Sequence, residues 1–170
     1  MLEKLFDRFF PEQTAESIYE IDFERLYEAG IKCIIFDLDN TIAPYDVPEP
    51  DEKMVGFLNK LTEQGFKLCL LSNNGEARVA RFNERLGLYA VCKAKKPGRT
   101  GIGKALALMG GNTQNAALVG DQVLTDIWCG NRAGLLTILV KPASDRDEWT
   151  VRLKRPIEKI LLWYYKKNAV

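Results

Sequence analysis

Short apolar segments without alternating polar residues recur along this 170-residue chain, and they constrain its fold more than any other feature. Such segments are typical of strands buried on both faces, as in a parallel sheet covered by helices. Amphipathic stretches of helical length separate them. The expected strands are residues 31–37, 66–71, 89–92, 116–120 and 135–140, and the expected helices are residues 51–64, 76–86, 100–109 and 123–133. This order predicts an α/β fold with a doubly wound parallel sheet, whose ligands bind at the carboxyl ends of the strands.

The composition fits one globular domain. The hydrophobic fraction is 46% and the charged fraction 28%, and the length suffices for a proper core, so we expect a single domain over residues 1–170. No apolar stretch approaches the roughly 20 residues of a membrane-spanning helix. Glu3 and Asp7 interrupt the apolar positions that a secretory signal would need at the N-terminus. A cytoplasmic location is therefore expected.

The chain has no histidine, which excludes Ser-His-Asp triads, Cys-His nucleophile pairs and His-ligated zinc. Proton transfer near neutral pH must then fall to carboxylates, Lys, Tyr or Cys. None of the four cysteines forms a Cys-x-x-Cys pair, and we interpret them as free thiols in a reducing compartment. A net charge of +1 gives no reason to expect nucleic-acid binding.

Two carboxylates, Asp37 and Asp39, follow the first expected strand and precede Asn40 and Thr41. Residues i and i+2 of a strand point the same way, so these carboxylates repel each other unless a cation lies between them. Carboxylate and water oxygens suit Mg²⁺. The alternative interpretation is an ordinary turn, because Asp, Asn and Thr are common in turns and helix caps.

Polar side chains also follow the next three expected strands. In chain order they are Ser72 with Asn73, then Lys96, then Asp121 with Asp126. Each has an ordinary structural explanation, a helix cap for Ser72 or Asp121 and a solvated loop charge for Lys96. Because the carboxyl ends of parallel strands share one edge of the sheet, their coincidence instead predicts one polar site.

In this order the motifs resemble those of the haloacid-dehalogenase-like (HAD-like) phosphatase superfamily over residues 31–140. The matching positions are residues 37–41 (Asp-Leu-Asp-Asn-Thr), Ser72, Lys96 before Pro97, and residues 120–126 (Gly-Asp-Gln-Val-Leu-Thr-Asp). With the Ala-Lys-Lys-Pro segment at residues 94–97, they look like the small YqeG-like branch of subfamily IIIA, which is similar to phosphatidylglycerophosphate phosphatases. The resemblance implies a Rossmann-like HAD core and Mg²⁺-dependent hydrolysis of phosphomonoesters.

The resemblance also implies catalytic roles. Asp37 would be the nucleophile that forms an aspartyl-phosphate, and Asp39 would act first as general acid and then as general base. Mg²⁺ would be held by Asp37, by the backbone carbonyl of Asp39 and by Asp121. Lys96 would neutralise charge on the phosphoryl group in transit.

Further matching residues would support this chemistry. The phosphate oxygens would contact Lys96, Ser72 and loop amides near Asn40 and Asn73. Thr41 and Asp126 would contact and orient the residues that bind substrate and metal. Asp126 is expected to orient Lys96 or a metal-bound water, and direct binding of the metal by Asp126 is the open alternative.

No stretch of the sequence is long enough for a cap domain. Only residues 42–50 separate the first motif from the next expected helix, and between Ser72 and Lys96 there is room for one helix and one strand. The site should therefore be open, which favours a substrate whose bulk lies outside the pocket, such as a lipid headgroup or a macromolecule. The alternative is that a neighbouring subunit closes the site.

Both ends of the chain, residues 1–11 and 151–167, carry amphipathic patterns. The apolar positions are Leu2, Leu5, Phe6, Phe9 and Phe10 at the first end and Leu153, Ile157, Ile160, Leu161 and Tyr164 at the second. Residues 151–170 also contain six basic and one acidic side chain, with Trp163 and Tyr165 among them. A basic amphipathic helix with Trp and Tyr can lie in an anionic membrane interface. Packing of both segments on the edge of the sheet is the alternative.

These observations predict a Mg²⁺-dependent phosphomonoester hydrolase whose preferred substrate is a lipid phosphate, with phosphatidylglycerophosphate as the named candidate. A peripheral position on the inner face of the membrane would accompany that substrate. One alternative is a phosphatase for a soluble sugar phosphate or nucleotide. Another, from a different class, is a non-catalytic adaptor that binds a partner through its basic C-terminal helix.

Overall fold

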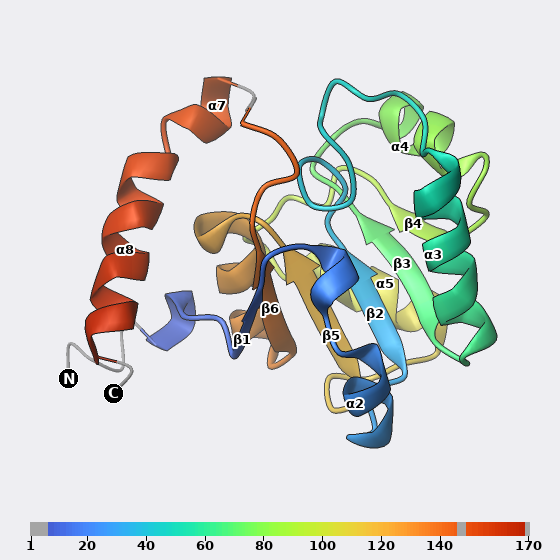
Figure 1. Cartoon of the computed structure of the whole chain (residues 1–170), viewed down its shortest axis with the longest axis horizontal. Helices are drawn as coiled ribbons and strands as arrows, with labels where there is room; N and C mark the ends of the chain where they lie inside the picture. Colours follow the sequence, from blue (N-terminus) through green and yellow to red (C-terminus); the bar gives the residue numbers. More distant parts are fainter. Residues whose placement is uncertain (1–6, 146–148, 169–170) are drawn as a thin grey trace.

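In the computed structural model, which describes residues 7–145 and 149–168, six strands form one sheet in the order β1-β6-β5-β2-β3-β4 (Figure 1). Every pairing in it is parallel. The strands are β1 (Gln13–Ala15), β2 (Cys33–Phe36), β3 (Lys67–Leu71), β4 (Tyr89–Val91), β5 (Ala116–Gly120) and β6 (Leu136–Val140). The predicted α/β class is therefore confirmed, and β1 is a strand that the apolar pattern did not predict.

Helices cover both faces of the sheet (Figure 1). One face carries α2 (Phe23–Glu28), α3 (Glu52–Glu63) and α4 (Glu76–Asn83), and the other carries α5 (Thr100–Met109) and α6 (Trp128–Ala133). Along β2, Ile34 and Phe36 pack toward the first group of helices, whereas Cys33 and Ile35 pack toward the second. Burial on both faces explains why these strands are apolar at every position.

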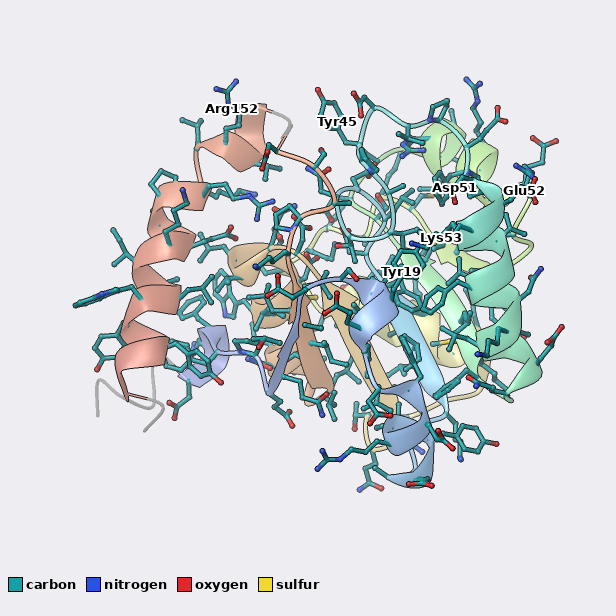
Figure 2. The ribbon with its side chains drawn as sticks, viewed as in Figure 1. Tyr19, Tyr45, Asp51, Glu52, Lys53 and Arg152 are labelled. Atoms are coloured by element: carbon teal, nitrogen blue, oxygen red, sulfur yellow. The ribbon has the colours of Figure 1, made fainter. Side chains whose placement is uncertain are left out.

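The start of α3 shows how the sequence fixes a helix end and packs the preceding chain against it. The Asp51 carboxylate accepts a hydrogen bond from the Met54 N–H at 2.8 Å, which caps the helix. Tyr19 of η2 (Ile18–Glu20) reaches α3, where its ring meets Phe57 edge-on at 4.8 Å and lies under the Lys53 ammonium (Figure 2). The segment between β1 and β2 is thus held on the same face as α3.

The connections reverse direction between β2 and β5, which are neighbours in the sheet. From β2 the chain continues to β3 on one side, and from β5 it continues to β6 on the other. Loops that diverge in this way open a crevice at the carboxyl edge of an α/β sheet, where ligands bind. Asp37 directly follows β2 and Asp121 directly follows β5, so the two carboxylates flank this crevice.

No domain is inserted between β2 and α3 or between Ser72 and Lys96, and the structure describes every residue of both stretches. A loop of residues 37–51 joins β2 to α3, and only α4 and β4 lie between Ser72 and Lys96. The carboxyl edge of the sheet is therefore not covered by an inserted domain in this part of the chain.

The expected helix at residues 123–133 forms as two elements. A π-helical turn, η3 (Val123–Ile127), comes first, and α6 follows and ends at Gly134, whose φ of 75° is left-handed. Glycine adopts that conformation without a steric penalty. Wide turns of the π type are frequent at functional sites, and this one carries Asp126.

The two terminal segments lie side by side beyond the β1 edge of the sheet (Figure 1). They contain η1 (Asp7–Phe9) at one end and α7 (Trp149–Arg152) with α8 (Arg155–Asn168) at the other. The Phe9 ring lies 5.1 Å from that of Trp128, and the Phe10 ring lies 5.0 Å from that of Tyr165. Phe9 and Phe10 therefore pack on the fold, as the alternative for the N-terminal pattern proposed. Leu2, Leu5 and Phe6 lie outside the described residues.

The apolar side chains of the C-terminal segment divide between two faces. Leu161 and Leu162 pack toward the fold against Val123, Ile127 and Leu139. Leu153, Ile157, Ile160 and Trp163 are 68%, 53%, 67% and 63% exposed, and we call these four residues the outer ridge. The apolar positions predicted for the C-terminal segment therefore face outward only in part. Leu161 packs toward the fold, and the Tyr164 ring stacks on the Phe10 ring. Among the described residues, no helix is long and apolar enough to cross a membrane.

Candidate active site

Three buried carboxylates meet at the carboxyl edge of the sheet. Asp37 follows β2, Asp121 follows β5, Asp126 belongs to η3, and one oxygen from each lies within 4.8 Å of the others. The Thr41 hydroxyl joins two of them, at 3.0 Å from Asp37 Oδ2 and 3.1 Å from Asp121 Oδ1. Buried like charges at this separation repel strongly, so the cluster needs positive charge to remain ionised.

Lys96 supplies part of that charge. Its ammonium lies 2.5 Å from Asp37 Oδ1 and 2.7 Å from Asp126 Oδ1, and it donates to the Leu71 carbonyl at 3.0 Å, so all three donors are used. Burial disfavours the charged form, but Asp126 and Asp37 outweigh it and raise the pKa of Lys96 above its usual value. With its side chain 3% exposed, Lys96 is no solvated loop charge.

Asp126 has both carboxylate oxygens engaged within the protein. Oδ1 faces Lys96, and Oδ2 accepts from the Gln122 N–H at 3.1 Å. This geometry favours the expectation that Asp126 orients Lys96. Gly120 makes the arrangement sterically feasible, because a Cβ at that position would lie 2.3 Å from the Asp126 Cβ.

Arg155, at the start of α8, brings a second cation that the sequence did not connect with the site. Its Nη2 lies 2.5 Å from Asp121 Oδ2, and its Nη1 donates to the Asp121 carbonyl at 3.0 Å. The buried Glu158 carboxylate accepts from the Leu124 N–H at 3.0 Å and from Arg155 Nη1 at 3.2 Å. Arg155 therefore attaches α8 to the loop after β5, and Glu158 attaches it to η3. Asp121 caps no helix, contrary to the structural alternative.

Asp39 lies at the rim of the cluster and accepts hydrogen bonds on both oxygens. Asn74 Nδ2 at 2.8 Å and the Ser72 hydroxyl at 3.4 Å approach Oδ2, and Arg78 Nε approaches Oδ1 at 3.3 Å. The N-cap of α4 is Gly75, so Ser72 does not cap that helix. Asn74 and Arg78 are further residues of the site that the motifs did not single out.

Asn73 and Asn40 use their side chains to hold neighbouring loops. Asn73 Oδ1 accepts from the Lys96 N–H at 2.7 Å, and Nδ2 donates to the Lys96 carbonyl at 3.3 Å. Asn40 has a left-handed φ of 62°, and its Oδ1 accepts from the Ser144 hydroxyl at 3.0 Å. Phosphate binding by Asn73 and by the loop at Asn40 stays a prediction.

A small polar pocket of 110 Å³ opens above these groups. It is lined by Asp37, Asp39, Ser72, Asn73, Asn74, Lys96, Gln122, Thr125, Val151 and Lys154. Typical small-molecule pockets are roughly three times this size or larger. The pocket has room for a phosphate group, and the rest of a substrate would lie outside it.

The donor set fits a hard divalent cation. Among the described residues the clustered metal-binding groups are all carboxylates, the kind of ligand that Mg²⁺ prefers over thiolate or imidazole. Three carboxylates face two cations, Lys96 and Arg155, so negative charge remains in excess. Asp37, Asp121 and Asp126 each offer an oxygen that could hold such an ion, and the Thr41 hydroxyl joins the first two.

Without a bound metal ion, Asp37 and Asp121 take up protons more readily than ordinary carboxyl groups, because their pKa values are raised. Burial raises the pKa of Asp37 well above its usual value, against the opposing effect of Lys96, and Asp126 and Asp121 add to the rise. Burial, with Asp126, likewise raises the pKa of Asp121 to about 7, against Arg155 and Thr41. The folded protein therefore holds these protons more tightly than the unfolded chain does.

We expect the metal-free protein to become less stable as pH rises from about 5 to about 7, because the unfolded chain releases these protons near pH 4 and the folded protein releases them later. Mg²⁺ should then raise the unfolding temperature more at about pH 8 than at about pH 5. Thermal unfolding over this range, with and without Mg²⁺, measures both effects. Asp121→Asn should flatten the profile, and a metal-free protein that gains stability over the same interval would contradict the expectation.

Comparisons with known proteins show which family and which relatives this chain is similar to. A family model described as HAD-hydrolase-like matches residues 93–161. The chain is 36% identical over 169 residues to "Probable phosphatase YqeG" of Bacillus subtilis (strain 168). The alignment covers 99% of this chain and 96% of that protein. It is 31% identical over 159 residues to the chloroplastic phosphatidylglycerophosphate phosphatase 1 of Chlamydomonas reinhardtii, spanning 87% of this chain and 59% of that protein.

A solved structure shows the same fold. The cobalt-bound deoxy-D-mannose-octulosonate 8-phosphate phosphatase (YrbI) of Haemophilus influenzae aligns with a TM-score of 0.55 at 15% identity, over 79% of this chain and 89% of that one. At this identity the similarity concerns the fold alone, and it agrees with the parallel sheet covered by helices described above.

Proposed function

This chain belongs to the HAD-like phosphatase superfamily, in its YqeG-like branch, and we propose that within it the protein is a Mg²⁺-dependent phosphomonoester hydrolase with Asp37 as nucleophile. Membership makes it a hydrolase of phosphate esters. The covalent mechanism, the identity of the metal and the substrate are the proposal. The observation that carries it is the position of Asp37, held by Lys96 and Thr41 on the wall of a polar pocket that Asp39 also lines.

In the first step an Asp37 oxygen attacks phosphorus, and the bond from phosphorus to the ester oxygen breaks with its electron pair on the leaving oxygen. Asp39, protonated at this stage, donates its proton to that oxygen, and an alcohol departs. Lys96, which contacts Asp37, lies close enough to balance negative charge as it spreads over the phosphoryl oxygens.

In the second step Asp39, now a carboxylate, takes a proton from a water molecule that attacks phosphorus. The bond between phosphorus and the Asp37 oxygen breaks, which frees phosphate and regenerates the Asp37 carboxylate and the carboxylic acid form of Asp39. Since the chain has no histidine, a carboxyl group is the natural carrier of this proton. Asp126 acts only through Lys96, which it holds in place at 2.7 Å.

Asp37, Asp121 and the backbone carbonyl of Asp39 would hold Mg²⁺. When bound there, the ion supplies positive charge that shields the nucleophile from the negative phosphate. The carboxylate oxygens of the cluster and its excess negative charge support this choice of a hard cation over a softer metal.

For the substrate we propose a lipid phosphate, with phosphatidylglycerophosphate as the first candidate. The algal relative, 31% identical, is named for that activity. The pocket of 110 Å³ admits a phosphate group and leaves the bulk of the ester outside. A phosphatase for a soluble sugar phosphate or nucleotide is the alternative substrate class. The complete set of Asp37, Asp39, Lys96 and Asp121 disfavours a non-catalytic adaptor.

The outer ridge supports a contact with an anionic lipid surface. Its four large apolar side chains are more than half exposed, and the exposed Arg152 and Lys159 lie along the same segment. Arg152 points away from the fold at the same edge of the molecule as Tyr45 of the loop after β2 (Figure 2). Lys154 lines the pocket and Arg155 binds Asp121, so these two residues belong to the site and not to a free basic face.

Changing Leu153, Ile157, Ile160 and Trp163 together to Ser should release the protein from vesicles rich in anionic lipid. The variant should show a raised apparent KM for phosphatidylglycerophosphate in those vesicles and an unchanged rate on a small soluble phosphate ester, because the ridge lies outside the pocket. Vesicle co-sedimentation and Mg²⁺-dependent phosphate release measure the two effects. Leu108→Ser, at a half-exposed position of α5, is the matched control.

Two outcomes would overturn the lipid proposal. If the wild type does not bind anionic vesicles and hydrolyses a sugar phosphate or nucleotide in preference to phosphatidylglycerophosphate, the soluble alternative holds. If the ridge variant loses activity on soluble and lipid esters together, the ridge is needed for the fold, and its exposed side chains no longer support a lipid contact.

A further inference from the structure

Arg78, in the first turn of α4, contacts both Asp39 and the loop after β2. Its Nε and Nη2 lie 3.3 Å and 3.1 Å from Asp39 Oδ1. Its Nη1 donates to the Pro48 carbonyl at 3.4 Å, and the guanidinium lies 5.1 Å from the centre of the Phe82 ring. With its side chain only 20% exposed, Arg78 is held from three sides.

We propose that Arg78 is a positioning residue that holds the Asp39 carboxyl in the orientation from which it transfers the proton. This inference rests on the role of Asp39 in the proposed function. Arg78 fixes Oδ1, while Asn74 and Ser72 fix Oδ2, so the carboxyl is restrained on both oxygens. A misplacement of about 1 Å in a reacting group can cost on the order of a hundredfold in rate, so such restraint matters.

Two neighbouring arginines, Arg81 of α4 and Arg85 just after that helix, show what is particular to Arg78. Arg81 pairs with Glu49 at 3.0 Å, and Arg85 donates to the Pro50 carbonyl at 3.0 Å, so both also hold the loop after β2. The polar contacts of Arg81 and Arg85 go to Glu49, Pro50 and Glu52 and not to the site, and the Arg81 side chain is 61% exposed. Arg78 alone among these three links the loop to the proposed acid, which makes Arg81 a matched control for any effect that acts through the loop.

When the general acid is misoriented, the rate of hydrolysis falls by different factors for alkyl and aryl phosphates. An alkoxide needs a proton as it departs, whereas a nitrophenolate is a stable anion and needs little help. A variant that only misplaces Asp39 should therefore lose activity on alkyl phosphates far more than on 4-nitrophenyl phosphate. A defect in phosphate binding or in folding would lower both together.

The test compares kcat/KM on 4-nitrophenyl phosphate with kcat/KM on the alkyl phosphate that the wild type hydrolyses best. Arg78→Met should lose about a hundredfold on the alkyl ester and less than about fivefold on the aryl ester. Arg78→Lys should recover part of the loss, because it restores the charge without the two-sided contact. Asp39→Asn should show the same selectivity more strongly, and Arg81→Met should match the wild type.

An equal loss on both esters, or no loss on the alkyl ester, would overturn the role of Arg78. Thermal unfolding shows whether Arg78→Met folds as the wild type does. If it does not, Arg78→Gln takes its place in the kinetic comparison. If Asp39→Asn is selective and the Arg78 variants are not, the inference fails and the proposed function stands. If Asp39→Asn is itself unselective, the general-acid step of the proposed function is wrong, and the inference falls with it.

Discussion

Replacement of Asp37 by Asn should lower kcat by at least about a hundredfold, or about 2.7 kcal/mol, and leave the protein folded. An amide oxygen is a poor nucleophile, and the remaining groups of the site cannot form the covalent intermediate in its place. Because Asp37 shares its site with the buried carboxylates of Asp121 and Asp126, the substitution also relieves repulsion. The metal-free variant should therefore unfold at the same temperature as the wild type or at a higher one.

The measurement is steady-state turnover of the best phosphomonoester together with thermal unfolding of the metal-free protein. Asp7→Asn, at an exposed position of η1, makes the same chemical change away from the site and should leave both values unchanged. Residual activity above about a hundredth of the wild type, in a preparation free of wild-type enzyme, would show that Asp37 is not the nucleophile.

Removal of divalent cations with EDTA should abolish turnover, and Mg²⁺ should restore it. Without the ion, the negative charge of the carboxylate cluster repels the phosphate group of the substrate, even with Lys96 and Arg155 present. Zn²⁺ should restore little activity, since the chain has no histidine and the cluster contains no cysteine among the described residues. Turnover after chelation and stepwise return of each metal measures this.

Calorimetric titration with Mg²⁺ gives a second readout that does not depend on activity. The wild type should bind one ion, and Asp121→Asn should bind it at least about tenfold more weakly, as loss of a ligand predicts. Full activity after rigorous chelation, or unchanged Mg²⁺ affinity in the Asp121 variant, would contradict the assignment of this site to the metal.

The strands that carry the site were predictable because both of their faces are buried. In β2, β3 and β5 nearly every side chain is buried, so each appears in the sequence as an unbroken apolar segment with a polar residue at its end. Strand β1 escaped prediction because its three residues, Gln13, Thr14 and Ala15, lie at the edge of the sheet and are largely exposed. The π-helical form of η3 also escaped, since its apolar positions fit an α-helix equally well.

The motifs located Asp37, Asp39, Lys96 and Asp121, because each directly follows a strand or its short loop. Arg78 and Arg155 were not located, because each belongs to an amphipathic helix that carries at least one other basic residue. Periodicity does not distinguish the one cation that turns toward the site from those that face solvent. Arg155 reaches Asp121 only because Glu158 and the apolar inner face of α8 dock that helix on η3.

Detection of the covalent intermediate tests the central claim most directly. Turnover is quenched in acid within milliseconds to seconds, and mass spectrometry then locates the phosphoryl group in the digested protein. The mechanism predicts phosphoryl on Asp37 and its absence from Asp37→Asn. With 4-nitrophenyl phosphate, whose leaving group needs little help from an acid, it also predicts accumulation of the intermediate in Asp39→Asn, which lacks the base for the second step. Phosphoryl on another residue, or turnover with no phosphoenzyme in either the wild type or Asp39→Asn, would contradict the mechanism.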